Sequence, residues 1–303
     1  MELLDRLKEQ YQWQEVKFVN EALIETELGR KRLRYWSDRA LLDWHIAWRD
    51  SCSVTPYMLA DRMIRNKDQD AQIEWKEGWV TVHDEVDASF RHNPEEKKIS
   101  QMIGSMIQYG VRATADVEPT IAKEPRFQQV QKDLPSFHED QQSLIQSLLK
   151  ESEVRLKKAE ALQTSLNKVP VPLLDPVTSS DQAKMIHQVF IWFGSKSYPE
   201  RGYYSLRSFL VSWLDQFGED SCQHILDELF EHEAMTREQS ILLLAECLKP
   251  YELDRLVHVL RKEPTEAELA KALELVLKEW EHSKTLVQEM SALIDKKKKV
   301  VPS

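Results

Sequence analysis

The chain has 303 residues, which is enough for one large domain or two smaller ones with a hydrophobic core. Its apolar fraction of 42% and charged fraction of 30% are ordinary for a globular protein, and its net charge of -10 disfavours non-specific binding to nucleic acid or anionic membranes. No apolar run reaches the roughly 18 residues of a membrane span. The charged, amphipathic N-terminus is unlike a signal peptide. The three cysteines have no paired spacing, which indicates a reducing compartment rather than a disulfide framework or a zinc site.

Helix and strand signals alternate in the first fifty residues. Apolar residues at helical spacing predict a first helix, and irregular alternation then predicts one or two strands. A turn at Gly29 leads to another strand, and Asp38 is a favourable N-cap for the helix that follows. The predicted elements are a helix, one or two strands, a strand and a helix, over residues 2–13, 15–27, 31–36 and 38–50.

The clearest strand signal is a hairpin. Residues 73–75 and 79–83 alternate apolar and polar side chains on either side of the turn formed by residues 76–78. The apolar run from Met58 to Ile64 lies upstream of the hairpin. A polar cluster over residues 66–70, typical of a loop, separates the two. Together these runs predict a meander of three short strands.

Almost everything after Asn93 has a helical pattern. Helices are predicted over residues 93–110, 137–167, 179–194, 204–217, 221–233, 236–247, 250–262 and 265–295. The first of these is expected to end at Gly110. Prolines exclude a helix over residues 169–176. A small sheet lobe followed by a larger helical lobe is the predicted organisation.

Two stretches carry a resemblance to a known family. Residues 26–50, with a glycine turn, a strand and a helix, and residues 62–87 resemble the N-terminal lobe of the protein-kinase-like fold. The version they resemble is that of aminoglycoside phosphotransferases and the related spore-coat-associated kinase-like proteins of endospore-forming bacteria. Residues 241–262 and the final helix are similar to that family's C-terminal helices. The resemblance implies an α+β, two-lobed fold with an antiparallel-sheet N-lobe over residues 1–87 and a helical C-lobe over residues 88–303.

The sequence departs from the family where an active kinase needs its catalytic groups. Phosphoryl transfer needs a catalytic Asp, an Asn or Asp for magnesium, and a lysine on the third strand. The chain has no H-x-D with a suitably spaced Asn, because its only H-x-D is His138 to Asp140 at the expected start of a helix. Arg34 stands at the lysine position, with Lys31 nearby, and Gly29 is not part of a glycine-rich loop.

These departures predict a noncatalytic kinase-like protein, or pseudokinase, that binds other proteins and needs no cofactor. The resemblance adds spore coat components as partners, and the mother-cell cytoplasm or the spore coat as the location. No nucleic acid or membrane partner is expected, and the sequence specifies no oligomeric state. The alternative is a divergent small-molecule phosphotransferase that uses ATP and magnesium.

Four residues are candidates for a remnant nucleotide site. Arg34 and Asp43 could form a pair equivalent to the kinase Lys–Glu pair, although an ordinary surface ion pair is the simpler interpretation. Asp175 and Asp181 could be catalytic or metal-binding carboxylates if the protein is active. The simpler interpretation makes Asp175 a turn residue before a proline and Asp181 part of a helix cap.

Three further hypotheses belong to other classes of protein. One predicted helical face carries potential metal ligands at the spacing of helical di-metal carboxylate sites, namely His224, Glu228, Glu231 and His232. The simpler interpretation of this face is a solvated, amphipathic helix. Four tryptophans could form a stacking platform or pack in the core, namely Trp44, Trp48, Trp75 and Trp79. A winged-helix DNA-binding regulator would have its helix at residues 56–65 and its wing at the hairpin.

Overall fold

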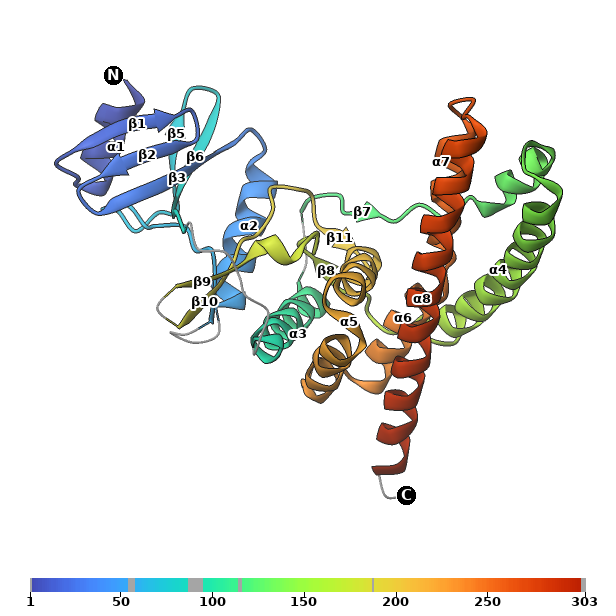
Figure 1. The fold of residues 1–303 in the computed structure, drawn as a ribbon. Coiled ribbons are helices and arrows are strands. Elements are labelled where there is room, and N and C mark those ends of the chain that lie inside the picture. Colours follow the sequence, from blue (N-terminus) through green and yellow to red (C-terminus); the bar gives the residue numbers. More distant parts are fainter. Residues whose placement is uncertain (1, 54–57, 87–94, 114–115, 187, 301–303) are drawn as a thin grey trace.

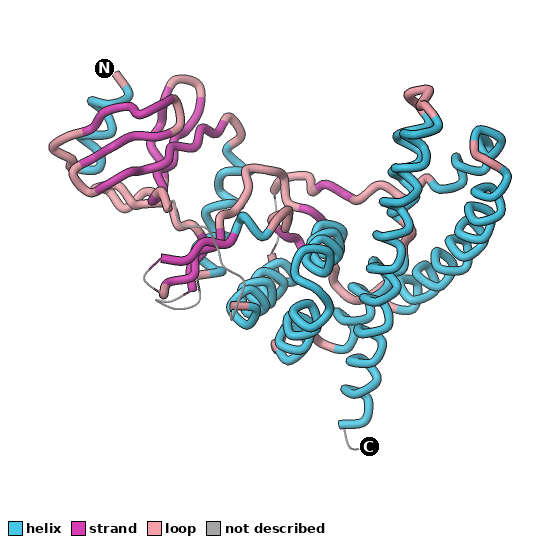
Figure 2. Tube along the Cα trace, viewed as in Figure 1, coloured by secondary structure: helices cyan, strands magenta, loops and turns pink. Residues whose placement is uncertain are grey.

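The computed structural model describes residues 2–53, 58–86, 95–113, 116–186 and 188–300. A five-stranded antiparallel sheet with one short helix forms one end of the molecule, and the remainder is mostly helical (Figures 1 and 2). The predicted α+β, two-lobed fold is therefore confirmed. No helix within the described ranges is long and apolar enough to cross a membrane.

The two faces of the N-lobe sheet differ, because the outer face packs on a helix and the inner face carries charged side chains. Its strands, in spatial order, are β1 (Val16–Asn20), β2 (Leu23–Thr26), β3 (Gly29–Trp36), β6 (Gly78–Asp84) and β5 (Gln72–Trp75). Helix α1 (Leu3–Tyr11) packs on the outer face, where Leu7, Leu33 and Val82 are buried in one small hydrophobic core. Because side chains alternate along a strand, Arg32 and Arg34 lie on the opposite, inner face.

The predicted hairpin is present as β5 and β6. Trp75 pairs with Gly78 across a two-residue turn, in which Lys76 has a φ of 52°. Gly78 serves a close approach, because a Cβ atom there would lie 2.2 Å from the carbonyl oxygen of Trp36. The turn is therefore where the sequence placed it, and its glycine is required by the contact with the end of β3.

The predicted three-stranded meander is wrong in one strand. The run at residues 58–64 supplies the short strand β4 (Met58–Ala60), which pairs in parallel with β10 (Val189–Trp192). β10 pairs in turn with β9 (Ala183–Ile186), and these three strands form a separate sheet. This pairing brings Asp61, which follows β4, next to the segment that follows β10.

The helix predicted over residues 179–194 is also wrong. The structure has a short 3-10 turn η2 (Ser180–Gln182) and then the hairpin of β9 and β10. The four residues of β10 are Val, Phe, Ile and Trp, types that favour a strand packed on both faces. A run this short carries no helical periodicity that could separate the two alternatives.

The C-lobe begins with helix α3 (Glu96–Arg112), which continues past its predicted end at Gly110. Gly110 lies inside the helix and does not end it. A side chain is excluded at this position, because a Cβ atom would lie 2.2 Å from the carbonyl oxygen of Leu173. This glycine lets α3 approach the short strand β8 (Leu173–Leu174), which leads directly to Asp175.

The remaining helices match the sequence predictions closely. A non-helical glycine, Gly218, kinks α5 (Tyr204–Glu231) with a φ of 84°, and the sequence pattern accordingly predicted two helices there. The remaining elements are β7 (Thr120–Ile121), η1 (Phe127–Ser136), α4 (Glu139–Ser165), β11 (Glu200–Arg201), α5 (Tyr204–Glu231), α6 (Arg237–Leu248), η3 (Tyr251–Leu253), α7 (Asp254–Leu260) and α8 (Glu266–Val300).

Two hydrophobic cores hold the C-lobe. The larger one includes residues of α2 (Arg39–Cys52), β4 and β10 as well as α3, α5 and α6, so elements from the first sixty residues pack against the helical lobe. The smaller core joins η1, α4, α7 and the first half of α8. The proposed lobe boundary at residue 87 falls where residues 87–94 lie outside the described ranges, and it stays a prediction.

Candidate functional site between the two lobes

Asp61 is the centre of a buried polar cluster where the inner face of the sheet meets the rest of the protein. Its Oδ1 accepts hydrogen bonds from Arg49 Nε on α2 and from the Gly194 N–H, both at 2.9 Å. Its Oδ2 accepts one from Arg34 Nη2 on β3 at 2.9 Å and another from Arg32 Nη2 at 3.3 Å. One carboxylate therefore joins β3, α2 and the segment after β10.

The Asp61 carboxylate and the guanidinium groups around it keep each other ionised. Burial alone would raise the pKa of Asp61, but Arg49 and Arg34 outweigh it and lower that pKa to about 2. Burial lowers the pKa of Arg34 to about 10, and the attraction of Asp61 opposes the change. Both groups are charged at neutral pH, so removing Asp61 would leave guanidinium groups buried without their counter-charge.

Two buried histidines complete the cluster in their neutral forms. Trp36 Nε1 can only donate, and it donates to Thr81 Oγ1 at 2.9 Å. The Thr81 hydroxyl is then free to donate to His83 Nε2 at 3.0 Å, so His83 Nδ1 carries the proton and donates to the Asp61 carbonyl oxygen at 2.8 Å. Burial lowers the pKa of His83 to about 3, which agrees with this neutral tautomer.

His45 on α2 is fixed in the opposite tautomer. Its Nε2 lies 2.9 Å from the carbonyl oxygen of Ser197 and must donate, while its Nδ1 accepts from Arg49 Nη1 at 2.8 Å. Burial first and the Arg49 charge second lower the pKa of His45 to about 3. The imidazole therefore has no free nitrogen with which to accept a proton.

The segment after β10 is held by hydrogen bonds from several elements, most of them to Ser195. Ser195 donates its N–H to Asp175 Oδ2 at 2.7 Å and its hydroxyl to Asp175 Oδ1 at 2.5 Å. The Ser195 carbonyl oxygen accepts from Arg34 Nη1 at 2.9 Å and from Arg49 Nη2 at 3.1 Å. Burial raises the pKa of Asp175, against the influence of Arg49 and of the Ser195 hydrogen bonds.

The structure brings together two of the four residues predicted for a nucleotide site. Arg34 and Asp175 both contact Ser195. Asp43 is half-exposed on α2 and pairs with Arg39 at 2.9 Å, so the predicted Arg34–Asp43 pair is replaced by Arg34–Asp61. Asp181 is exposed in η2, where its N–H bonds to the capping hydroxyl of Ser179 at 2.9 Å.

The sequence analysis missed Asp61 and Arg49, which make the densest contacts of the cluster. A signal for Asp61 was present, because it follows directly on the apolar run that forms β4. Arg49 was detectable as a charged residue next to Trp48 on a helix that is otherwise apolar on much of its surface. Both signals become meaningful only once β4 is paired with β10.

The histidines that the sequence offered as catalytic or metal-binding candidates do not come together in one site. His138 is the N-cap residue of α4, as its position predicted. His224 is exposed, and His232 caps the end of α5 with its Nδ1 accepting from the Ala234 N–H at 3.1 Å. No group of three or more His, Cys, Asp or Glu side chains in the described ranges is placed to hold a metal ion.

The winged-helix hypothesis is wrong, because the described part of its proposed helix, residues 58–65, is a strand and a loop. Trp44 and Trp48 are buried in the core as the simpler interpretation predicted, whereas Trp75 and Trp79 are half-buried. The three cysteines are buried free thiols.

No protein-family model and no curated protein sequence matches the chain. Solved structures do match. An aminoglycoside phosphotransferase from Alicyclobacillus acidocaldarius superposes with a TM-score of 0.64 and 10% identity, over 94% of this chain and 93% of that one. The chain has a protein-kinase-like fold. Two other solved structures superpose less well, each at 10% identity. Spectinomycin phosphotransferase in its AMP-bound complex has a TM-score of 0.49, over 92% of this chain and 97% of that one. Choline kinase from Cryptosporidium parvum has a TM-score of 0.43, over 97% of this chain and 96% of that one.

The protein-kinase-like fold gives the cluster a point of reference. In active kinases a lysine on the third strand contacts the phosphates, and the Asp of an Asp-Phe-Gly motif binds magnesium. In this kinase-like chain the third-strand cation, Arg34, is bonded to Asp61 and Ser195. The sequence at the end of β10 is Trp192-Phe193-Gly194, and Trp192 is fully buried in the core. The Arg34 guanidinium is thus bonded within the protein, and the indole of Trp192 offers no oxygen ligand for magnesium.

Proposed function

We propose that this kinase-like protein does not transfer phosphoryl groups and acts by binding other proteins. The observation that supports this function best is the bonding of Ser195. Arg34 and Asp175, the two residues placed most like kinase catalytic groups, both bond to it instead of facing a substrate. Trp192 in place of a metal-binding aspartate supports the same proposal.

The partner class follows from the resemblance of the sequence to spore-coat-associated kinase-like proteins. Spore coat components are therefore the first proteins to test as partners, and the proposal includes no cofactor. The net charge of -10 also favours partners with basic surfaces.

A thermal-shift measurement tests the noncatalytic part. We expect the melting temperature of the full chain to be the same with ATP, with ATP and magnesium, and without either. A magnesium-dependent rise that Asp175→Ala or Asp181→Ala removes would favour the divergent phosphotransferase instead. Asp43→Ala is the matched control, because Asp43 is an exposed carboxylate outside the cluster.

A second measurement is independent of ligand affinity. Radiolabelled ATP and magnesium are incubated with the chain and with aminoglycosides or choline, the substrate types of phosphotransferases and kinases with this fold. The proposal expects no label transfer above that of the Arg34→Ala variant, and transfer that depends on Arg34 would end it.

A further inference from the structure

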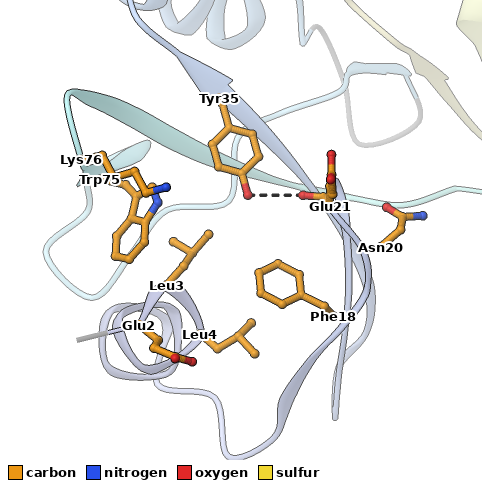
Figure 3. Close-up of a pocket in the computed structure, with 9 residues that line it drawn as sticks. All are labelled: Glu2, Leu3, Leu4, Phe18, Asn20, Glu21, Tyr35, Trp75 and Lys76. Atoms are coloured by element: carbon orange, nitrogen blue, oxygen red, sulfur yellow. Dashed lines mark hydrogen bonds between the residues drawn. The ribbon is translucent and has the colours of Figure 1, made fainter.

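A groove on the outer face of the N-lobe sheet remains outside this function. It has a volume of about 720 Å³ and lies beside the first turn of α1. Figure 3 shows Leu3 and Leu4 of α1 facing the rings of Phe18, Tyr35 and Trp75, which come from β1, β3 and β5. The groove thus crosses the sheet from its β1 edge to its β5 edge.

The β1 edge is open. β1 pairs only with β2 among the strands of the described residues, so one side of its backbone carries unpaired donors and acceptors. Its side chains from Lys17 to Asn20 are exposed, with Phe18 46% exposed on the groove side and the next residue, Val19, 47% exposed. Natural edge strands are protected by charge, by bulges or by short length. Lys17 is the only charged residue of β1, and the pairing with β2 is regular from Val16 to Phe18 before it shifts between Phe18 and Asn20.

The wall of the groove is held in place by bonds within the sheet. The Tyr35 hydroxyl donates to the carbonyl oxygen of Glu21 at 3.3 Å, and the Leu33 N–H donates to the carbonyl oxygen of Ala22 at 2.8 Å (Figure 3 shows the first bond). These bonds attach the turn between β1 and β2 to β3. A partner would therefore meet a preformed surface, which lowers the entropic cost of binding.

The charge around the edge selects the partner. Residues 14–28 contain four glutamates and one lysine. The lysine, Lys17, is paired with Glu25 at 2.7 Å, and Glu27 accepts the N–H groups of Gln14 and Glu15. The Glu15 and Glu21 side chains are exposed beside β1, and the charged residues that line the groove are Glu2, Glu21 and, at its β5 end, Lys76. An acidic edge with apolar side chains complements a basic segment with apolar residues at alternate positions.

We infer that β1 and the groove bind an extended, basic segment of a partner protein, which adds a sixth strand beside β1 and places a large apolar side chain against Phe18. The inference rests on the proposed protein-binding function and specifies its partner. Main-chain hydrogen bonds to β1 hold the segment, the groove selects its apolar residue, and Glu15 and Glu21 select its lysines or arginines.

Fluorescence anisotropy with synthetic peptides tests the inference on the full chain. The probe is a labelled peptide of about seven residues that alternates lysine and valine around a central phenylalanine. Its first comparison peptide has glutamate in place of each lysine. Its second has the same side chains with alternate backbone nitrogens methylated, so that it cannot pair as a strand.

We expect the basic peptide to bind and both comparison peptides to fail. Phe18→Lys should raise the Kd for the basic peptide at least about tenfold, because it removes the apolar contact and adds a positive charge to the β1 edge. Leu28→Lys is the matched control, since Leu28 is 67% exposed in the turn between β2 and β3 and does not line the groove. Glu21→Lys should weaken binding and reduce its dependence on salt.

Three results would overturn the inference. Equal binding of the methylated peptide would exclude strand pairing, and equal binding to the Phe18→Lys protein would exclude the groove. Concentration-dependent dimerisation that Phe18→Lys abolishes would make a second copy the occupant. None of these results touches the noncatalytic proposal, which the nucleotide measurements test separately.

Discussion

The two faces of one strand show the contrast within this molecule. Arg34 points from β3 to the inner face, where it is 9% exposed and bonded to Asp61 and Ser195. Its neighbour Tyr35 points to the outer face, where it is 40% exposed and lines an open groove. The inner face, which kinases use for nucleotides, is occupied by the protein's own groups. The outer face carries an apolar groove that reaches the open edge of β1, and these are the two features of the proposed binding surface.

The contrast predicts that changes to the inner face cost far more stability than changes to the outer face. The largest effect is expected for Asp61→Ala, which leaves Arg34 and Arg49 buried without their carboxylate. We expect a loss of about 3–5 kcal/mol in the free energy of unfolding, measured with a chemical denaturant.

Asp61→Asn keeps an acceptor for the Gly194 N–H and provides a milder variant if the alanine variant does not fold. Asp43→Ala, at an exposed ion pair with Arg39, should cost less than about 1 kcal/mol. Equal losses for Asp61→Ala and Asp43→Ala would show that the cluster does not stabilise the contact between the lobes.

Gly194→Ala tests how tightly the segment after β10 is packed. A Cβ atom there would lie 2.6 Å from Arg49 Nη2 and from Trp48 Cζ3. We expect a loss of about 1–3 kcal/mol from overpacking, measured by the same denaturant unfolding. An unchanged midpoint would mean that the inner face can loosen without cost.

The dependence of stability on pH should report the neutral histidines. The folded-state pKa values of His45 and His83 are lowered from 6.5 to about 3, so between these values the unfolded chain binds protons that the native state does not. Stability therefore falls as pH drops through this window, by at most about 1.4 kcal/mol per pH unit for each histidine. Asp175 acts in the opposite direction, because its raised pKa favours the native state at low pH.

Unfolding measured from pH 7 to pH 4 checks both signs. His83→Gln should flatten the slope, and Asp175→Asn should steepen it. A slope that no variant changes would contradict the assignment of these groups as the source.

The smallest effect is expected on the outer face. Phe18→Thr removes an aromatic ring that is 46% exposed, so the free energy of unfolding should change by less than about 0.5 kcal/mol. Differential scanning calorimetry with and without the basic peptide separates this small cost from a loss of binding. A loss above about 2 kcal/mol would place Phe18 in the core instead of a binding surface.

The sequence by itself determined most of the local elements and the two-lobed organisation. Alternating side chains fixed the β5–β6 hairpin, and helical spacing fixed α1, α2 and α4, because these signals depend only on neighbours along the chain. It also placed Arg34 on the third strand, and it contains no H-x-D with a suitably spaced Asn.

Only the tertiary structure decided which side chains meet. Asp61 and Gly194 are 133 positions apart, and the parallel pairing of β4 with β10 brings them together. The same pairing requires a hairpin where the sequence predicted a helix, and it gives Arg34 a partner other than Asp43. A buried ion pair depends on the distances among residues far apart in the chain, and periodicity along the sequence carries no information about those distances.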